Sequence, residues 1–166
     1  MQALPQTLAQ RLIQAGLAKP TEIVGCSDAE IEQLEQRFRV SLPVSYKYFM
    51  RIMGKMAGRF ELDAMWTCDA LGLARIRAEA ILAQGDQDYA DAIALSGEVA
   101  QERFVLPATA FVFLASAYDF IYFDTTAGSD PPVFLFQLGD LVPSNSLPSF
   151  SEWVRNAIEE YTPPQL

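Results

Sequence analysis

Two aspartates flank an apolar run in the second half of this chain, and carboxylates so placed are candidates for acid–base chemistry. Asp119 precedes the run Phe120-Ile121-Tyr122-Phe123, and Asp124 follows it. A carboxyl group in apolar surroundings has a raised pKa and can act as a general acid. In an alternating strand, however, the two aspartates lie on opposite faces, which weakens a paired-carboxylate mechanism. We favour the alternative that each marks a strand end, where it reaches solvent or caps a turn.

A second set of oxygen atoms could converge at one end of a sheet. Asp124, Asp130 and Asp140 lie close to several hydroxyl side chains in the sequence, and Ca²⁺ or Mg²⁺ binds to such oxygens. Their spacing matches no EF-hand loop, so we predict a solvated acidic rim rather than a metal site.

Histidine is absent from all 166 residues. This removes the most common general base, the Ser-His and Cys-His nucleophile systems, and the most common ligand of zinc or iron. Carboxylate-only catalysis and a hard-metal site remain open on these grounds, although we predict a protein that is not an enzyme and holds no cofactor. A carboxylate-based enzyme is the least favoured of the alternatives.

The acidic residues are concentrated in the second half of the chain. Residues 1–85 contain ten Lys or Arg and nine Asp or Glu, whereas residues 86–166 contain two and twelve, within a net charge of −9. Such a half repels nucleic acids and anionic membranes and attracts a basic partner. We predict a continuous negative surface that contains Asp119, Asp124, Asp130 and Asp140. An acidic surface that serves solubility alone is the alternative.

Two aromatic residues are candidates for the same interface. Exposed Trp and Tyr side chains often anchor protein complexes, and we expect Trp66 and Tyr118 to be partly exposed. Core packing is the alternative for both.

Composition predicts one domain over residues 1–166, because an apolar fraction of 51% supplies an ample core. The longest uncharged run is too short to cross a bilayer, and the first residues lack the basic and apolar parts of a secretion signal. We therefore predict a cytoplasmic protein. Cys26 and Cys68 are expected to be reduced, partly buried thiols, with a disulfide between them as the alternative.

The first half of the chain predicts mainly helices. We expect a helix over 5–15, and Ser27 and Glu30 have the spacing of a capping box that opens a helical pair up to about Met53. A strand is expected over 59–67. Helical character follows over 70–83, with Leu73 and Ile76 on the buried face, and over 86–100.

The second half predicts strands and a closing helix. Aromatic and β-branched runs indicate strands over 111–114, 120–123 and 133–137, before a helix introduced by Pro148 and Ser149. The order of elements predicts an α+β fold in which an antiparallel sheet has its helices on one face. We expect Phe134 and Trp153 to share a single core.

Two segments carry a resemblance to a known family. The first is a helix that ends in Leu42-Pro43 and is followed by Tyr46-Lys47 and Phe49-Met50. The second comprises Pro132-Val133-Phe134-Leu135-Phe136 and Ser149-Phe150-Ser151-Glu152-Trp153-Val154. These motifs resemble the SUKH superfamily, whose fungal members regulate cell-wall synthesis and whose bacterial members are mostly immunity proteins. The resemblance covers roughly 23–60 and 108–161. It departs from the family in the turn Ala115–Tyr118 and in the stretch 69–103, which looks like a helical insertion.

The resemblance implies a protein-binding module. Together with the charge pattern, it leads us to expect a cytoplasmic immunity protein that occludes a basic toxin domain through its acidic surface. A non-immunity adaptor or regulatory module of the same fold is the alternative. Neither function requires nucleic acid, membrane or cofactor binding.

Overall fold

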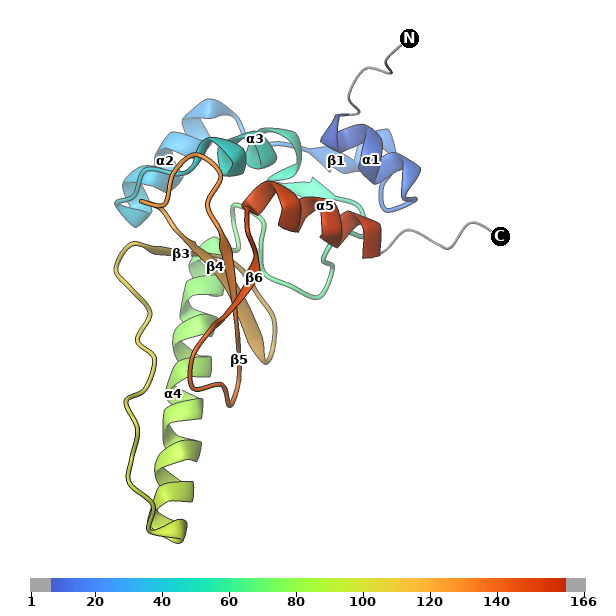
Figure 1. Cartoon of the computed structure of the whole chain (residues 1–166). Helices are drawn as coiled ribbons and strands as arrows, with labels where there is room; N and C mark the ends of the chain where they lie inside the picture. Colours follow the sequence, from blue (N-terminus) through green and yellow to red (C-terminus); the bar gives the residue numbers. More distant parts are fainter. Residues whose placement is uncertain (1–6, 161–166) are drawn as a thin grey trace.

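The structure is a computed structural model, and it describes residues 7–160 (Figure 1). The start of the predicted first helix and the distal end of the last one, with Tyr161, lie outside this part. Along the chain the elements are α1 (Leu8–Gln14), a 3-10 turn η1 (Pro20–Glu22), β1 (Ile23–Val24), α2 (Asp28–Phe38), α3 (Val44–Met53), β2 (Met56–Ala57), α4 (Leu71–Ser96), β3 (Ala110–Ala115), β4 (Asp119–Asp124), β5 (Val133–Gln137), β6 (Ser144–Leu147) and α5 (Phe150–Glu160).

The main sheet is an antiparallel meander in the order β3-β4-β5-β6, and β1 pairs separately with β2. Phe111 lies opposite Phe123 across β3 and β4, and Tyr122 lies opposite Phe134 across β4 and β5. Because side chains alternate along a strand, β3, β4 and β5 send apolar residues to both faces. The three predicted strands are confirmed, and the α+β class is confirmed with them.

Helices cover both faces of this sheet. One core contains side chains of α1, α2, α3 and α5 packed on Phe113 and Phe123. A second core lies on the opposite face, where Ala74 and Ala78 of α4 pack on Phe120. The expectation that the helices share one face therefore holds for four of these five helices and is wrong for α4. Phe134 packs against the second core and Trp153 belongs to the first, so the sheet divides what we expected to be a single core.

The buried face of α4 differs from the predicted one. Leu73 and Ile76 are 56% and 62% exposed, and the residues that face the sheet include Ala74, Ala78 and Gly85. Small side chains let the helix axis approach the strands closely, and this favours the alanine face over the leucine and isoleucine face. Gly85 does not interrupt the helix, which continues to Ser96.

The strand predicted over 59–67 does not form. Residues 58–63 are turns, and of the segment 59–67 only Met65 forms a β-bridge, to Ala115. Phe60 and Trp66 are instead directed into the first core, where both rings contact Phe49. Burial of two large rings stabilises an irregular backbone here.

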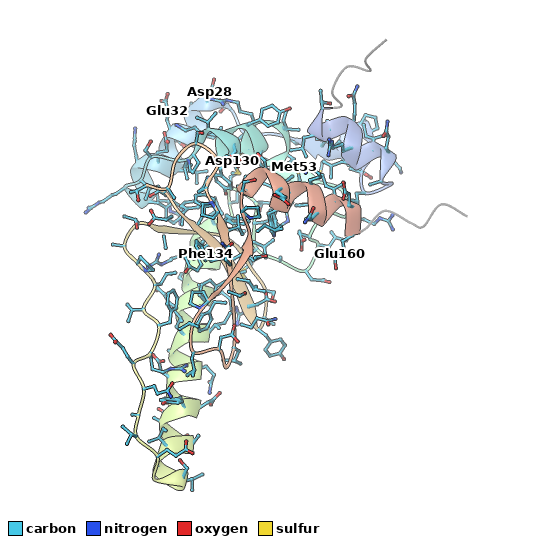
Figure 2. All side chains as sticks on the ribbon, viewed as in Figure 1. Asp28, Glu32, Met53, Asp130, Phe134 and Glu160 are labelled. Carbon is cyan, nitrogen blue, oxygen red and sulfur yellow. The ribbon has the colours of Figure 1, made fainter. Side chains whose placement is uncertain are left out.

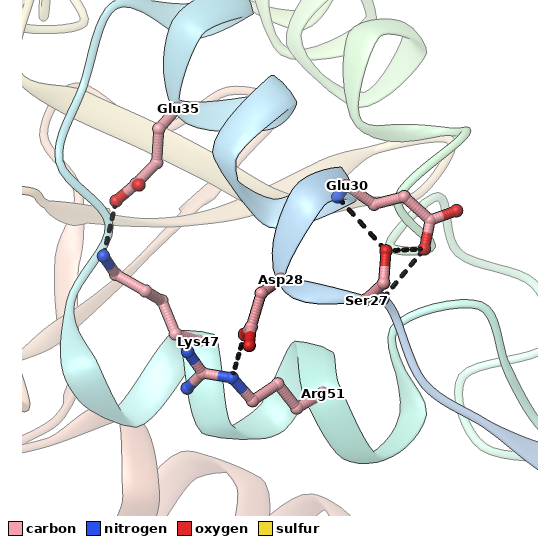
Figure 3. Close-up of polar contacts among 6 residues, drawn as sticks. All are labelled: Ser27, Asp28, Glu30, Glu35, Lys47 and Arg51. Carbon is pink, nitrogen blue, oxygen red and sulfur yellow. Dashed lines mark hydrogen bonds and ion pairs between the residues drawn. The ribbon is translucent and has the colours of Figure 1, made fainter.

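The helical pair α2–α3 has the predicted capping box (Figure 3). The Ser27 hydroxyl accepts a hydrogen bond from the Glu30 N–H, and the Glu30 carboxylate accepts one from the Ser27 N–H. Pro43 is the N-cap of α3, and Leu42 before it is buried.

Ion pairs fix α2 against α3. Arg51 binds Asp28 at 2.7 Å, and Lys47 binds Glu35 at 2.7 Å (Figure 3). The residues that carry the family resemblance thus include a structural clamp between these helices.

Candidate functional site

A groove of about 490 Å³ opens between the turns after β2 and one end of the main sheet. Its floor is apolar and includes Leu17, Leu114 and Ile121. Its polar lining combines three carboxylates with one cation, namely Glu61, Asp63, Asp119 and Arg59. The groove therefore offers apolar contact and an excess of negative charge in one place.

Long-range contacts hold the irregular segment that carries Glu61. The N–H of Arg59 donates to the carbonyl of Leu17 at 2.7 Å, and the Arg59 guanidinium donates to the carbonyl of Gly16 at 2.9 Å. The indole N–H of Trp66 donates to the carbonyl of Glu61 at 3.2 Å. These contacts keep Glu61 at a φ of 46°, a left-handed conformation that costs a non-glycine residue about 1–2 kcal/mol.

Glu61 is the electrostatically unusual member of the groove. Burial raises the pKa of its carboxyl group, and the negative charges of Glu160 and Asp119 raise that pKa further. Glu160 lies at the end of α5 (Figure 2). Within residues 7–160, no Lys or Arg forms an ion pair with Glu61, Asp63 or Asp119. An incoming cation would relieve this repulsion.

Of the predicted site residues, Asp119 lines this groove, and Tyr118 precedes Asp119 in the turn between β3 and β4. The carboxylate of Asp119 accepts a hydrogen bond from the hydroxyl of Ser116, so its orientation is fixed at the start of β4. Tyr118 occupies the adjoining turn and is 71% exposed, as expected. The β3–β4 turn therefore presents a charged and an aromatic side chain together.

Trp66 corrects the sequence-based expectation. The side chain was expected to be partly exposed, but it is only 6% exposed and its ring contacts Phe49 and Phe60. It acts beneath the groove, through its hydrogen bond to the Glu61 carbonyl, and its ring is not available as an interface anchor.

The remaining aspartates divide between the two ends of the sheet. Asp140 accepts a hydrogen bond from the N–H of Gln137, which lies opposite Asp119, so Asp140 belongs to the end with the groove. Asp124 lies at the other end of β4, about 17 Å from Asp119 at the usual rise per strand residue. Asp130 lies at that far end too and binds the N–H of Ser151 at the start of α5 (Figure 2). The four aspartates therefore do not share one edge.

Asp124 and Asp130 have structural roles. Thr126 donates to Asp124 through its hydroxyl and its N–H, and these bonds hold the pKa of the Asp124 carboxyl group below its usual range. Asp130 supplies a hydrogen bond to the first turn of α5, where a negative charge is also favoured by the helix dipole. Charge reversal of this pair would therefore disturb the fold as well as the surface.

Metal binding has no candidate centre in the described chain. Within residues 7–160, no group of three or more Cys, Asp or Glu side chains is placed to hold a metal ion. Cys26 and Cys68 are free and buried. None of the described helices is long and apolar enough to cross a membrane.

Comparison with known protein families identifies the family of this chain. Residues 25–156 match the SMI1 / KNR4 family (SUKH-1), and this match spans most of the chain. The protein belongs to the SUKH-1 family. The match begins just before the capping box of α2 and ends within α5, so it includes the ion-paired helices, α4 and the main sheet. No curated protein matches the sequence.

Membership of SUKH-1 supports a protein-interacting module of the immunity or regulator type. The residues that line the groove lie within the matched range 25–156, except Leu17, which precedes it.

Sequence reasoning missed Glu61. Its segment was interpreted as a strand, and residues 1–85, which contain it, are nearly neutral in total. The isolated acidic pair Glu61 and Asp63 between apolar residues was the only available signal.

Proposed function

We propose that this SUKH-1 protein is a cytoplasmic immunity protein that binds a basic toxin domain, with the groove at Glu61 and Asp119 as its main contact. The observation that carries the proposal is the group of unpaired carboxylates over an apolar floor. Of the surface predicted from the sequence, the proposal keeps Asp119, Tyr118 and Asp140.

The chemistry of the groove favours a partner segment with an arginine or lysine beside an apolar residue. A cation placed near Glu61 and Asp119 meets two negative charges with reduced access of water, which strengthens the attraction. Leu62 and Tyr118, 66% and 71% exposed, add apolar area near the charges. Interfaces commonly combine such an aromatic anchor with polar contacts around it.

Occlusion is the mechanism that this arrangement supports. A toxin that acts on an anionic substrate exposes a basic face, and a protein that covers this face blocks substrate entry without chemistry of its own. Complementary charge would also accelerate the encounter of the two proteins. We propose no catalytic step at the groove.

The test needs a basic toxin domain as the binding partner, and the products of the neighbouring genes are the first to be screened for one. Asp63→Lys reverses an exposed charge of the groove, and Glu61→Gln removes the carboxylate while keeping the size of the side chain. We expect both variants to bind more weakly and to protect toxin-expressing cells less well than the wild type. The association rate of the wild type should fall as salt rises, because salt screens the attraction.

Glu32→Lys is the matched control, since it reverses an exposed charge on α2, outside the groove. It should bind and protect like the wild type. Equal binding by wild type, Asp63→Lys and Glu61→Gln would exclude the groove as the contact. Loss of binding in Glu32→Lys alone would show that the interface lies on α2 and not at the groove.

A further inference from the structure

Helix α4 has a second uncharged face, directed away from the sheet. Its residues follow one another at alternating intervals of three and four, and all are exposed: Leu73, Ile76, Ala80, Ala83, Gln87, Ala90 and Ala94. We call this set the α4 seam. Leu73 and Ile76 leave more than half of their surface in water. The intervals are those of a heptad repeat, which is typical of a helix that packs along a second helix.

No other segment of the described chain covers this seam. The segment after α4 runs back along a different side of the helix, where the Arg103 guanidinium binds Asp86 and lies over the ring of Tyr89 (Figure 1). The sheet occupies the face with Ala74 and Ala78. The seam is therefore free over the whole length of the helix.

Charges beside the seam indicate the direction of the missing helix. Arg77, Gln84 and Asp91 each follow a seam residue by one position, so they lie on one flank at intervals of seven. Among residues 7–160, neither Arg77 nor Asp91 has an ion-pair partner. In a parallel pair this flank of each helix faces the opposite flank of the other, so Asp91 would lie near Asp86 of the second copy and the two negative charges would repel. Antiparallel helices centred on Gln84 place Arg77 of each beside Asp91 of the other.

We propose that a second copy of this chain covers the seam, with the two α4 helices packed antiparallel about a two-fold axis near Gln84. Closed two-fold pairing uses the same surface on both copies, which a seam complementary to itself supplies. Alanine at four of the seven positions lets the helices approach closely. The distal part of α4 extends beyond the sheet (Figure 1), so antiparallel packing places the two sheets at opposite ends.

Oligomeric state is the first measurement. Sedimentation of the full chain over a wide concentration range should show a reversible monomer–dimer equilibrium. Ala83→Glu should shift this equilibrium to monomer, because it adds a charge near the two-fold axis at an exposed position that the fold does not use. A wild type that stays monomeric at all concentrations would overturn the proposal.

Charge exchange tests the direction. Arg77→Asp alone and Asp91→Arg alone should each weaken the dimer, and the double variant should recover it. Glu32→Arg on α2 is the control and should dimerise normally. Failure of the double variant to recover, with both single variants folded, would contradict the antiparallel pairing.

A cross-link gives the register. Gln84→Cys should form a disulfide between copies under mild oxidation, whereas the native cysteines are buried and should not. Ser96→Cys on the same helix is the control, because twelve residues from the axis separate the two sulfur positions by about 36 Å. Cross-linking by both variants would indicate parallel packing and overturn the proposal.

Discussion

The Nζ of Lys47 lies 2.7 Å from the Oε1 of Glu35, and the same oxygen accepts the N–H of Leu42 at 2.7 Å. One carboxylate thus joins α2 to α3 and fixes the chain that connects them. Burial opposes the charge on Glu35, but the bonds from Lys47 and Leu42 outweigh it and hold its pKa below the usual value. Lys47 belongs to the segment by which the family is recognisable, and its role here is structural.

Glu35→Ala should lower the free energy of unfolding by roughly 1–3 kcal/mol, because it removes two hydrogen bonds to a charged group. Urea unfolding of both proteins would measure the difference. Glu32→Ala, on the exposed side of the same helix, should change the stability by no more than about 0.5 kcal/mol. Equal effects of the two substitutions would show that the clamp contributes nothing.

The capping-box residue Glu30 should make the protein sensitive to acid. Hydrogen bonds from Lys55, and then from Ser27, lower the pKa of Glu30 from 4.5 to about 2. Because the pKa of Glu30 is lower in the folded protein, its ionised carboxylate stabilises the fold. This stabilisation is complete above the pKa of 4.5 in the unfolded chain and is lost as the pH falls towards 2. Unfolding midpoints across this window should fall more steeply for the wild type than for Glu30→Gln. Parallel curves would rule out this contribution.

Tyr46→Phe should keep or increase stability. The Tyr46 side chain is fully buried, and its hydroxyl finds no hydrogen-bond partner in the described part of the chain. An unsatisfied buried polar group costs about 1–3 kcal/mol, which phenylalanine avoids.

The ring of Tyr46, unlike its hydroxyl group, is essential to the core. It contacts the rings of five phenylalanines, namely Phe49, Phe111, Phe113, Phe123 and Phe150. Tyr46→Ala should therefore cost about 3–5 kcal/mol. A thermal midpoint of Tyr46→Phe well below that of the wild type would mean that the hydroxyl has a partner.

Gly25→Ala should destabilise the protein by at least about 3 kcal/mol, since the chain has no room for a side chain there. A Cβ on Gly25 would lie 1.7 Å from the carbonyl oxygen of Arg51. The neighbouring hydrogen bond from Cys26 N–H to the Met50 carbonyl holds the two segments together. Gly97→Ala is the control, where only a φ of 73° opposes the side chain and a cost of about 1–2 kcal/mol is expected.

The sequence determined the local elements of this protein. The capping box of Ser27 and Glu30, the paired helices around Pro43, the aromatic strands and the terminal helix all follow from spacing and side-chain type. Such patterns are local, because a cap satisfies amides within one turn and a strand alternates residue by residue. The family resemblance rested on the same local features, and the match over residues 25–156 confirms it.

Tertiary structure decided which apolar surfaces are covered. Helix α4 has one face with Leu73 and Ile76 and another with Ala74 and Ala78, and periodicity does not reveal which one meets the sheet. The face with Ala74 and Ala78 meets the sheet because its small side chains let the helix approach the strands more closely. The separation of Asp119 from Asp124 is the length of strand β4, but only the packing of α5 against the sheet shows that Asp130 lies at the Asp124 end.

The groove was decided by tertiary structure most of all. Glu61 and Asp119 are distant in sequence, and the segment around Glu61 has no regular repeat that would predict its course. Its backbone is held by bonds from Arg59 to Gly16 and Leu17 and by the buried ring of Trp66. Local propensity cannot encode such bonds, because they exist only when three distant segments have already packed together.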